Sequence, residues 1–138
     1  MSRQYLGPYI NFHGRARDAM EFYHKVLGGR LDLQTMTQQG AFKPAGPGDR
    51  IMNGRLEAVG AFIIIGTDGH PDYAPTVGDH MAVALGGADK ARLTKIFSDL
   101  AEGGKVKGPL ARQPWGAEVG WLVDKFGVNW TVTVEMSK

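Results

Sequence analysis

The chain has 138 residues, a formal net charge of +2 and no cysteine. This length suits one compact domain, and the lack of cysteine excludes disulfides and thiolate chemistry. No apolar run approaches the ~20 residues of a membrane-spanning helix, and the N-terminus lacks the apolar core of a signal peptide. Lysine and arginine are scattered. We therefore expect a cytoplasmic protein that binds neither nucleic acid nor membrane.

The first half of the chain predicts a strand, a helix and three further strands. The first strand is the short extended segment Pro8–Phe12. Apolar side chains then recur at helical spacing until Gly28, which suits a left-handed helix end: Ala16, Ala19, Met20, Tyr23, Val26 and Leu27. The three strands that follow are predicted at Arg30–Gln38, Ile51–Glu57 and Ala61–Gly66.

Two long segments rich in glycine and proline interrupt this pattern. The first, Gln39–Asp49, is long enough to form a mobile flap. The second, Asp68–Gly78, is the natural junction between the two halves of the chain.

The second half predicts the same order of elements. The strand His80–Leu85 leads to a helix that begins after a capping Asp89 and ends at Gly103. Its apolar positions again follow helical spacing: Leu93, Ile96, Phe97, Leu100 and Ala101. Three strands follow, at Lys105–Leu110, Ala117–Val123 and Asn129–Glu135.

The two halves are copies of one strand–helix unit. Phe97 follows Phe22, and Gly103 follows Gly28, by the same 75 residues. Such a duplication predicts two similar modules packed together, with space for a ligand between them.

Alternation along the strands separates a bulky apolar face, which can pack under a helix, from a smaller or polar face. The second face carries Gly7, Tyr9, Asn11, His80, Ala82, Ala84, Thr131 and Thr133. It could line a cavity, or it could be the solvent face of an antiparallel sheet. Alternation alone leaves both interpretations open.

The three tryptophans divide in the same way. Trp121 and Trp130 alternate with apolar residues and are predicted to lie in the core. Trp115 stands just outside a strand, between Pro114 and Gly116. There it could stack on a planar ligand, contact a partner subunit or simply anchor the loop.

Several segments resemble the vicinal oxygen chelate superfamily, which includes glyoxalase I, bleomycin-resistance proteins and extradiol dioxygenases. The N-terminal part of its sequences is similar to three segments of this chain, Pro8–Gly14, Ala19–Tyr23 and Leu27–Gly29. The second half resembles the PhnB-like branch at Glu102–Val106, Trp115–Gly116 and Gly120–Trp130.

The resemblance implies an α+β fold in which two βαβββ modules form curved mixed sheets around a cup. Residues 1–138 would then be one domain, with module 1 at about 5–68 and module 2 at about 79–138. The small or polar face becomes the cup interior, so the predicted ligand-binding residues are His80, Tyr9, Asn11, Thr131, Thr133 and Trp115. The resemblance also implies a homodimer.

Enzymes of this superfamily hold one divalent metal through ligands on the first and last strands of each module. At those positions the chain has His80, but also Gly7 and Thr131, and Asp68 is the only ligand type within Ile63–Asp68. Because a catalytic metal needs several protein ligands, we predict no metal and no other cofactor, with His80 and Asp68 as the only candidate ligands.

Two functions follow from this comparison. The first is a PhnB-like protein that binds a small organic molecule in the cup without metal chemistry. The alternative is a metal-dependent lyase, isomerase or dioxygenase with a non-standard site, in which Asp68, Glu57 or Glu118 would lie near His80. A dimeric interaction protein with a vestigial cup is a third possibility, because a fold does not by itself fix a function. Whether the protein is an enzyme stays open.

Overall fold

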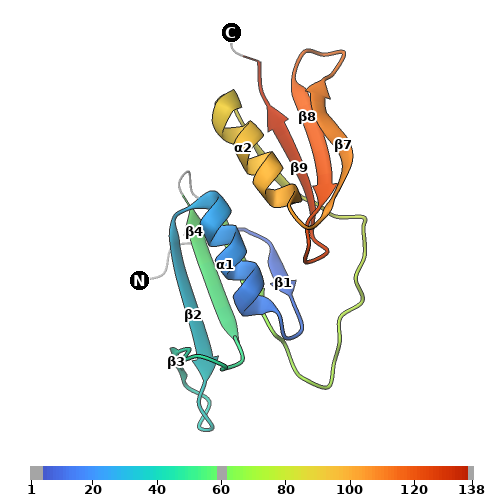
Figure 1. The fold of residues 1–138 in the computed structure, drawn as a ribbon. Helices are drawn as coiled ribbons and strands as arrows, with labels where there is room; N and C mark the ends of the chain where they lie inside the picture. Colours follow the sequence, from blue (N-terminus) through green and yellow to red (C-terminus); the bar gives the residue numbers. More distant parts are fainter. Residues whose placement is uncertain (1–4, 59–61, 137–138) are drawn as a thin grey trace. The chain divides into compact units, whose positions relative to one another are not determined.

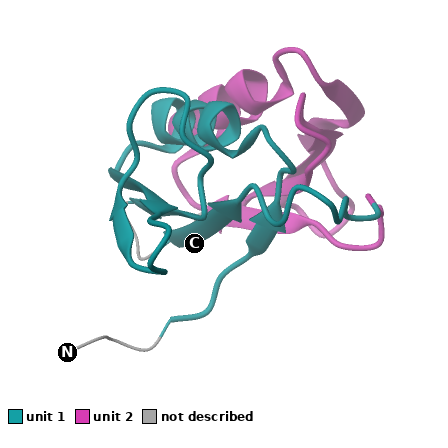
Figure 2. Cartoon of the chain, turned by 90° about the horizontal axis from the view of Figure 1, so that it is seen from below, with its two compact units in different colours: residues 1–76 teal, residues 77–138 magenta. Residues whose placement is uncertain are grey.

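The computed structural model describes residues 5–58 and 62–136. The chain forms two compact units, unit 1 at residues 1–76 and unit 2 at residues 77–138 (Figure 2). Each unit is one sheet with one helix on a single face, so the fold is α+β and follows the predicted βαβββ plan. Neither helix of the described residues is long and apolar enough to cross a membrane.

Unit 1 has a five-stranded mixed sheet. Its elements are β1 (Tyr9–Asn11), α1 (Ala16–Leu27), β2 (Arg30–Met36), β3 (Phe42–Pro44), β4 (Asn53–Ala58) and β5 (Phe62–Thr67) (Figure 1). The strand order is β1-β5-β4-β2-β3, in which β1 pairs with β5 in parallel and the other pairs are antiparallel. The first residue of the predicted strand Ala61–Gly66 lies outside the described residues.

The helix α1 buries one face against this sheet, as its apolar spacing predicts. Met20 and Tyr23 of that face are fully buried. Glycine makes room for Met20 on the sheet, because a Cβ at Gly66 would lie 2.7 Å from the Met20 sulfur. The helix ends at Gly28, where the backbone takes a φ of 74°.

Unit 2 repeats this plan with four strands. Its elements are β6 (Val83–Gly87), α2 (Lys90–Ala101), β7 (Lys105–Arg112), β8 (Glu118–Val123) and β9 (Asn129–Val134), and the strand order is β6-β9-β8-β7. The strand β6 pairs with β9 in parallel, as β1 does with β5. Asp89 caps α2 as predicted, since its Oδ1 accepts the Arg92 N–H at 3.1 Å.

The duplicated Gly-Gly pair occupies the same place in both units. A Cβ at Gly29 would fall on the backbone of Glu57 and Ala58, at the end of β4. A Cβ at Gly104 would fall on the backbone of Val123 and Asp124, at the end of β8. The second glycine of each pair is therefore required because two strands approach closely where the chain leaves the helix.

Two predicted boundaries are wrong. The segment Gln39–Asp49, expected to be a mobile loop, contains β3, which pairs with the end of β2. A tight turn makes this hairpin possible, because the Thr37 side chain accepts the Ala41 N–H at 3.1 Å and Gly40 takes a φ of 84°. The strand that is predicted to begin at His80 begins instead at Val83. Val83 pairs with a residue near the start of β9.

Candidate functional site

The open face of the unit 1 sheet, which points away from α1, is polar along two neighbouring strands. On β2, Arg30, Asp32 and Gln34 alternate with two leucines. On β4, three polar side chains alternate with residues that are buried toward the helix, Gly54, Leu56 and Ala58. Antiparallel pairing places these polar residues in three rows across the strands: Arg30 with Glu57, Asp32 with Arg55, and Gln34 with Asn53.

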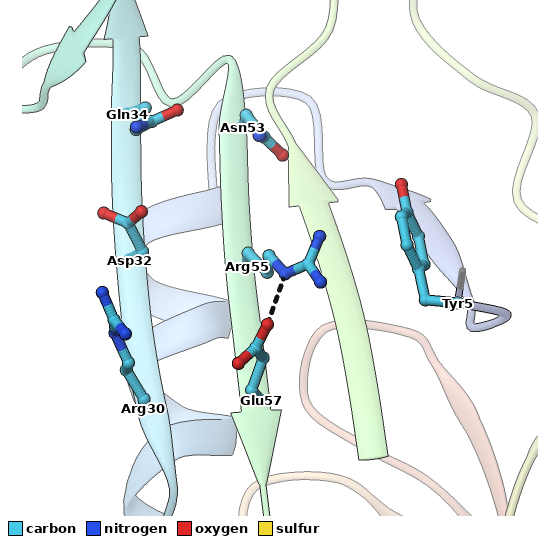
Figure 3. Close-up of a pocket in the computed structure, with 7 residues that line it drawn as sticks. All are labelled: Tyr5, Arg30, Asp32, Gln34, Asn53, Arg55 and Glu57. Atoms are coloured by element: carbon cyan, nitrogen blue, oxygen red, sulfur yellow. Dashed lines mark hydrogen bonds and ion pairs between the residues drawn. The ribbon is translucent and has the colours of Figure 1, made fainter. Parts of the chain in front are cut away.

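These rows form the floor of a hollow of about 550 Å³. Six of its lining residues come from β2 and β4, and the seventh, Tyr5, precedes β1 (Figure 3). The lining residues are Tyr5, Arg30, Asp32, Gln34, Asn53, Arg55 and Glu57. The volume lies within the range of known small-molecule sites, although the lining is more polar than is usual for drug-like ligands.

One ion pair is fixed within the hollow. The Arg55 Nε donates to Glu57 Oε1 at 2.9 Å, and both side chains are partly exposed. The Arg55 guanidinium also lies 4.7 Å from the centre of the Tyr5 ring, an arrangement that favours a cation over an aromatic face. Within residues 5–58 and 62–136, the side chains of Arg30 and Asp32 have no hydrogen-bond or ion-pair partner.

Of the predicted ligand-binding residues, Tyr9 and Asn11 lie on β1, at the edge of the same sheet. Tyr9 is 67% exposed, and neither residue lines the hollow. Asn11 Oδ1 accepts the His13 N–H at 2.9 Å, so this side chain shapes the turn that follows the strand.

Asp68, a candidate metal ligand, is buried and bound to the backbone. Its Oδ1 accepts the N–H groups of Gly14 and Ala16 at 2.9 and 2.8 Å, and its Oδ2 accepts the N–H of Ile51 at 2.8 Å. Two of these donors stand at the start of α1, where Arg15 provides no side-chain cap. Asp68 therefore caps the helix from a distant part of the chain, which accounts for its carboxylate.

Thr131 and Thr133 lie on the open face of the unit 2 sheet, as alternation predicts. They are opposite Ala84 and Gly86 of β6, while Trp130, Val132 and Val134 on the other face are buried. The β6 residues opposite the two threonines are small. The structure therefore brings these two predicted residues together on one face.

The prediction that Trp121 lies in the core is wrong, whereas that for Trp130 is confirmed. Trp121 pairs with Thr131 across β8 and β9 and is 43% exposed. Its ring covers Gly108 on β7, because a Cβ at Gly108 would fall among the ring atoms. A tryptophan can thus be anchored on the open face when a neighbouring strand has no side chain to exclude it.

His80 and Trp115 lie outside the strands of unit 2. His80 is exposed in a bend before β6, and Trp115 is 68% exposed in the turn between β7 and β8. Gly7, the first-strand position compared with His80, likewise precedes the first strand of its unit.

The two other carboxylates of the metal hypothesis have partners. Glu57 holds Arg55 in the hollow, and Glu118 pairs with Lys90 at 3.0 Å. Across the part of the chain that the structure describes, no three His, Asp or Glu residues gather closely enough to hold a metal ion. A metal-dependent activity stays a prediction.

The sequence reasoning missed most of the residues that line the hollow. Only Glu57 was considered, as a possible metal ligand. The signal was present, because Arg30, Asp32 and Gln34 alternate with Leu31 and Leu33 and so share one face of a strand. Their partners across β4 could not be read from the sequence, since the hairpin formed by β3 separates the two strands along the chain.

The sequence profile of the family described as 3-demethylubiquinone-9 3-methyltransferase matches residues 4–133. The chain belongs to this family. Among solved structures, protein PA1353 of Pseudomonas aeruginosa is 36% identical over 94% of this chain and 96% of its own, with a TM-score of 0.78. The family assignment agrees with the PhnB-like resemblance.

Two more distant structures show the fold of this PhnB-like family. A Bacillus cereus PhnB protein, described as a putative 3-demethylubiquinone-9 3-methyltransferase, is 22% identical over 94% of this chain and 98% of its own, with a TM-score of 0.72. A glyoxylase/bleomycin resistance protein/dioxygenase domain from Frankia is 9% identical over 99% of this chain and 98% of its own, with a TM-score of 0.62. The fold is thus glyoxalase-like.

Proposed function

We propose that this PhnB-like chain binds a small organic molecule and that the hollow of unit 1 is the binding site. The observation that carries the proposal is the polar lining of that hollow on two paired strands. Strands hold side chains more rigidly than loops do, so the polar groups are positioned before a ligand arrives.

Unpaired polar groups on this face support binding. Arg30 and Asp32 are two residues apart on β2, and the described residues provide no partner for either side chain. A sheet face that serves only as solvent-exposed surface also carries such groups. Here, however, they border a hollow together with an aromatic ring and an arginine that is already held in place.

The name of the family describes methyl transfer, which we do not extend to this chain. In the open α/β folds that bind nucleotide-like cofactors, a glycine-rich turn joins the first strand of a parallel sheet to a helix. Unit 1 and unit 2 instead have mixed sheets with a helix on one face. The proposal is therefore limited to binding. The homodimer, the cytoplasmic location and the ligand roles of the predicted unit 2 residues stay predictions.

A thermal-shift screen of small organic molecules tests the proposal. A ligand at 100 times its Kd adds about 2.7 kcal/mol of stability, which raises the Tm by several degrees. We expect some compounds to raise the Tm of the wild type and to lose this effect in an Asp32→Asn, Arg55→Gln double variant. The control Lys95→Gln removes an exposed ion pair on α2, far along the chain from the hollow, and should keep the effect.

A screen that yields no stabilising compound would contradict the proposal. So would compounds that stabilise the double variant as much as the wild type, because they would bind elsewhere.

A further inference from the structure

The guanidinium of Arg55 is held in place in the hollow by contacts within the protein. Its Nε donates to Glu57, and its Cζ lies 4.7 Å from the centre of the Tyr5 ring. Its two terminal nitrogens have no partner among the described residues. An arginine fixed in this way presents the fork of donors that matches a carboxylate, and little rotamer freedom is lost when an anion binds.

Asp32 stands directly across the strands from Arg55, yet the two side chains do not pair. Figure 3 shows the reason, because the Arg55 guanidinium is directed toward Tyr5 and away from β2. Asp32 is therefore left as an acceptor on one side of the hollow while Arg55 is a donor on the other. Gln34 and Asn53 continue the floor with neutral amides.

The charges in the hollow disfavour a ligand with a single charge. Arg30 and Arg55 balance Asp32 and Glu57, so the four side chains have no formal net charge. A simple anion at Arg55 would also face Asp32, and a simple cation at Asp32 would face the neighbouring Arg30. A molecule that carries both charges satisfies both sides at once.

We propose that the ligand is a small zwitterion whose carboxylate binds Arg55 and whose ammonium group binds Asp32. This inference rests on the proposed function and adds the chemical class of the ligand. Neighbouring strands lie ~4.8 Å apart, and the Arg55 side chain is directed away from β2, so the ligand needs a spacer of several bonds between its two charges. γ-Aminobutyrate, with three carbons between its amine and its carboxylate, meets this requirement.

The test compares three probes of equal chain length: γ-aminobutyrate, butyrate and butylammonium. Each is titrated into the ¹⁵N-labelled full-length protein, and amide shifts are followed by NMR. We expect γ-aminobutyrate to shift amides of β2 and β4 and to saturate at a concentration at least tenfold below that of either singly charged probe. Equal binding of butyrate or butylammonium would overturn the inference.

Variants then test the two ends of the ligand separately. Asp32→Asn should weaken γ-aminobutyrate at least tenfold and leave butyrate unchanged or tighter. Arg55→Lys keeps the charge but removes the fork, and it should weaken γ-aminobutyrate and butyrate at least fivefold. Lys95→Gln should bind like the wild type, since its ion pair lies on α2. Unchanged γ-aminobutyrate binding in Asp32→Asn would overturn the inference even if Arg55→Lys were unstable.

The failure of this inference is distinguishable from the failure of the proposed function. If compounds from the thermal-shift screen shift β2 and β4 amides while γ-aminobutyrate does not, the hollow is a binding site for another chemical class. If neither the screen nor the probes affect these amides, both proposals are wrong.

Discussion

At the scale of single residues, Asp68 shows how one carboxylate can join distant parts of the chain. It accepts N–H groups at the start of α1 and an N–H before β4, and only 4% of its surface is exposed. The first N–H groups of a helix have no partner within the helix, and burying them unpaired is costly. Asp68 supplies those partners, and its negative charge also favours the helix N-terminus.

Replacing Asp68 with asparagine should therefore destabilise the protein. The amide would place an N–H group against a backbone N–H, leaving buried donors unpaired. We expect the free energy of unfolding to fall by about 2–3 kcal/mol, measured by urea denaturation. Asp72→Asn is the matched control, because the Asp72 side chain is 81% exposed and should change stability by less than about 0.5 kcal/mol. Equal stability of the two variants would show that Asp68 is not a structural cap.

Asp124 is a second buried aspartate whose side chain organises the segment Asp124–Trp130. Its Oδ1 accepts the Phe126 and Val128 N–H groups at 2.8 and 3.1 Å, and its Oδ2 accepts the Trp130 Nε1–H at 2.9 Å. One side chain thus fixes the turn before β9 and satisfies the indole of a core tryptophan. These contacts give Asp124 a structural role in a segment that resembles the PhnB-like branch.

At the scale of elements, alternation predicted the faces of two neighbouring inner strands, β9 and β8, unequally. It succeeded on β9, where the buried residues are those that face α2. It failed on β8, because the size of Trp121 suggested the core, whereas Gly108 on the next strand provides a place for its ring on the open face. The side chains of a neighbouring strand thus determine where Trp121 lies. Alternation along one strand does not show which strand is its neighbour.

The site was less predictable than the elements for the same reason. The polar face of β2 was visible in the sequence, but its pairing with β4 depends on how the chain turns between them. The sequence also could not show that Asp68 turns toward backbone N–H groups or that the first strand of unit 2 begins after His80. His80, which was predicted on a strand, therefore lies in a bend before it.

The close approach of strands at the Gly-Gly pair makes a prediction for unit 2. Gly104→Ala should lower the free energy of unfolding by about 2–3 kcal/mol, because its Cβ would overlap the backbone of Val123 and Asp124, which cannot move aside easily. Gly87→Ala is the control, since its Cβ would meet only Leu93, at an ordinary 3.7 Å. Thermal unfolding followed by circular dichroism measures both. A Gly104→Ala variant as stable as the control would contradict the proposed role of the close approach.

At the scale of the whole molecule, the duplication predicted the architecture but not the division of roles between the copies. Both units have the helix, the Gly-Gly pair and the parallel pairing of their first and last strands. The charged hollow lies in unit 1, whereas the described open face of unit 2 has threonines, small residues and Trp121. The offset of 75 residues indicates that the two units are copies of one fold. The side chains on the open face of the sheet differ between the two units.

All three tryptophans of the chain lie in unit 2, and unit 1 has none. Intrinsic tryptophan fluorescence therefore reports the unfolding of one unit, whereas far-ultraviolet circular dichroism reports both. If residues 1–138 form one cooperative domain, as the sequence predicts, the two signals should give the same urea midpoint. Asp68→Asn, a change in unit 1, should then shift the fluorescence midpoint as well. Separate midpoints would instead show that each half of the duplication still unfolds on its own.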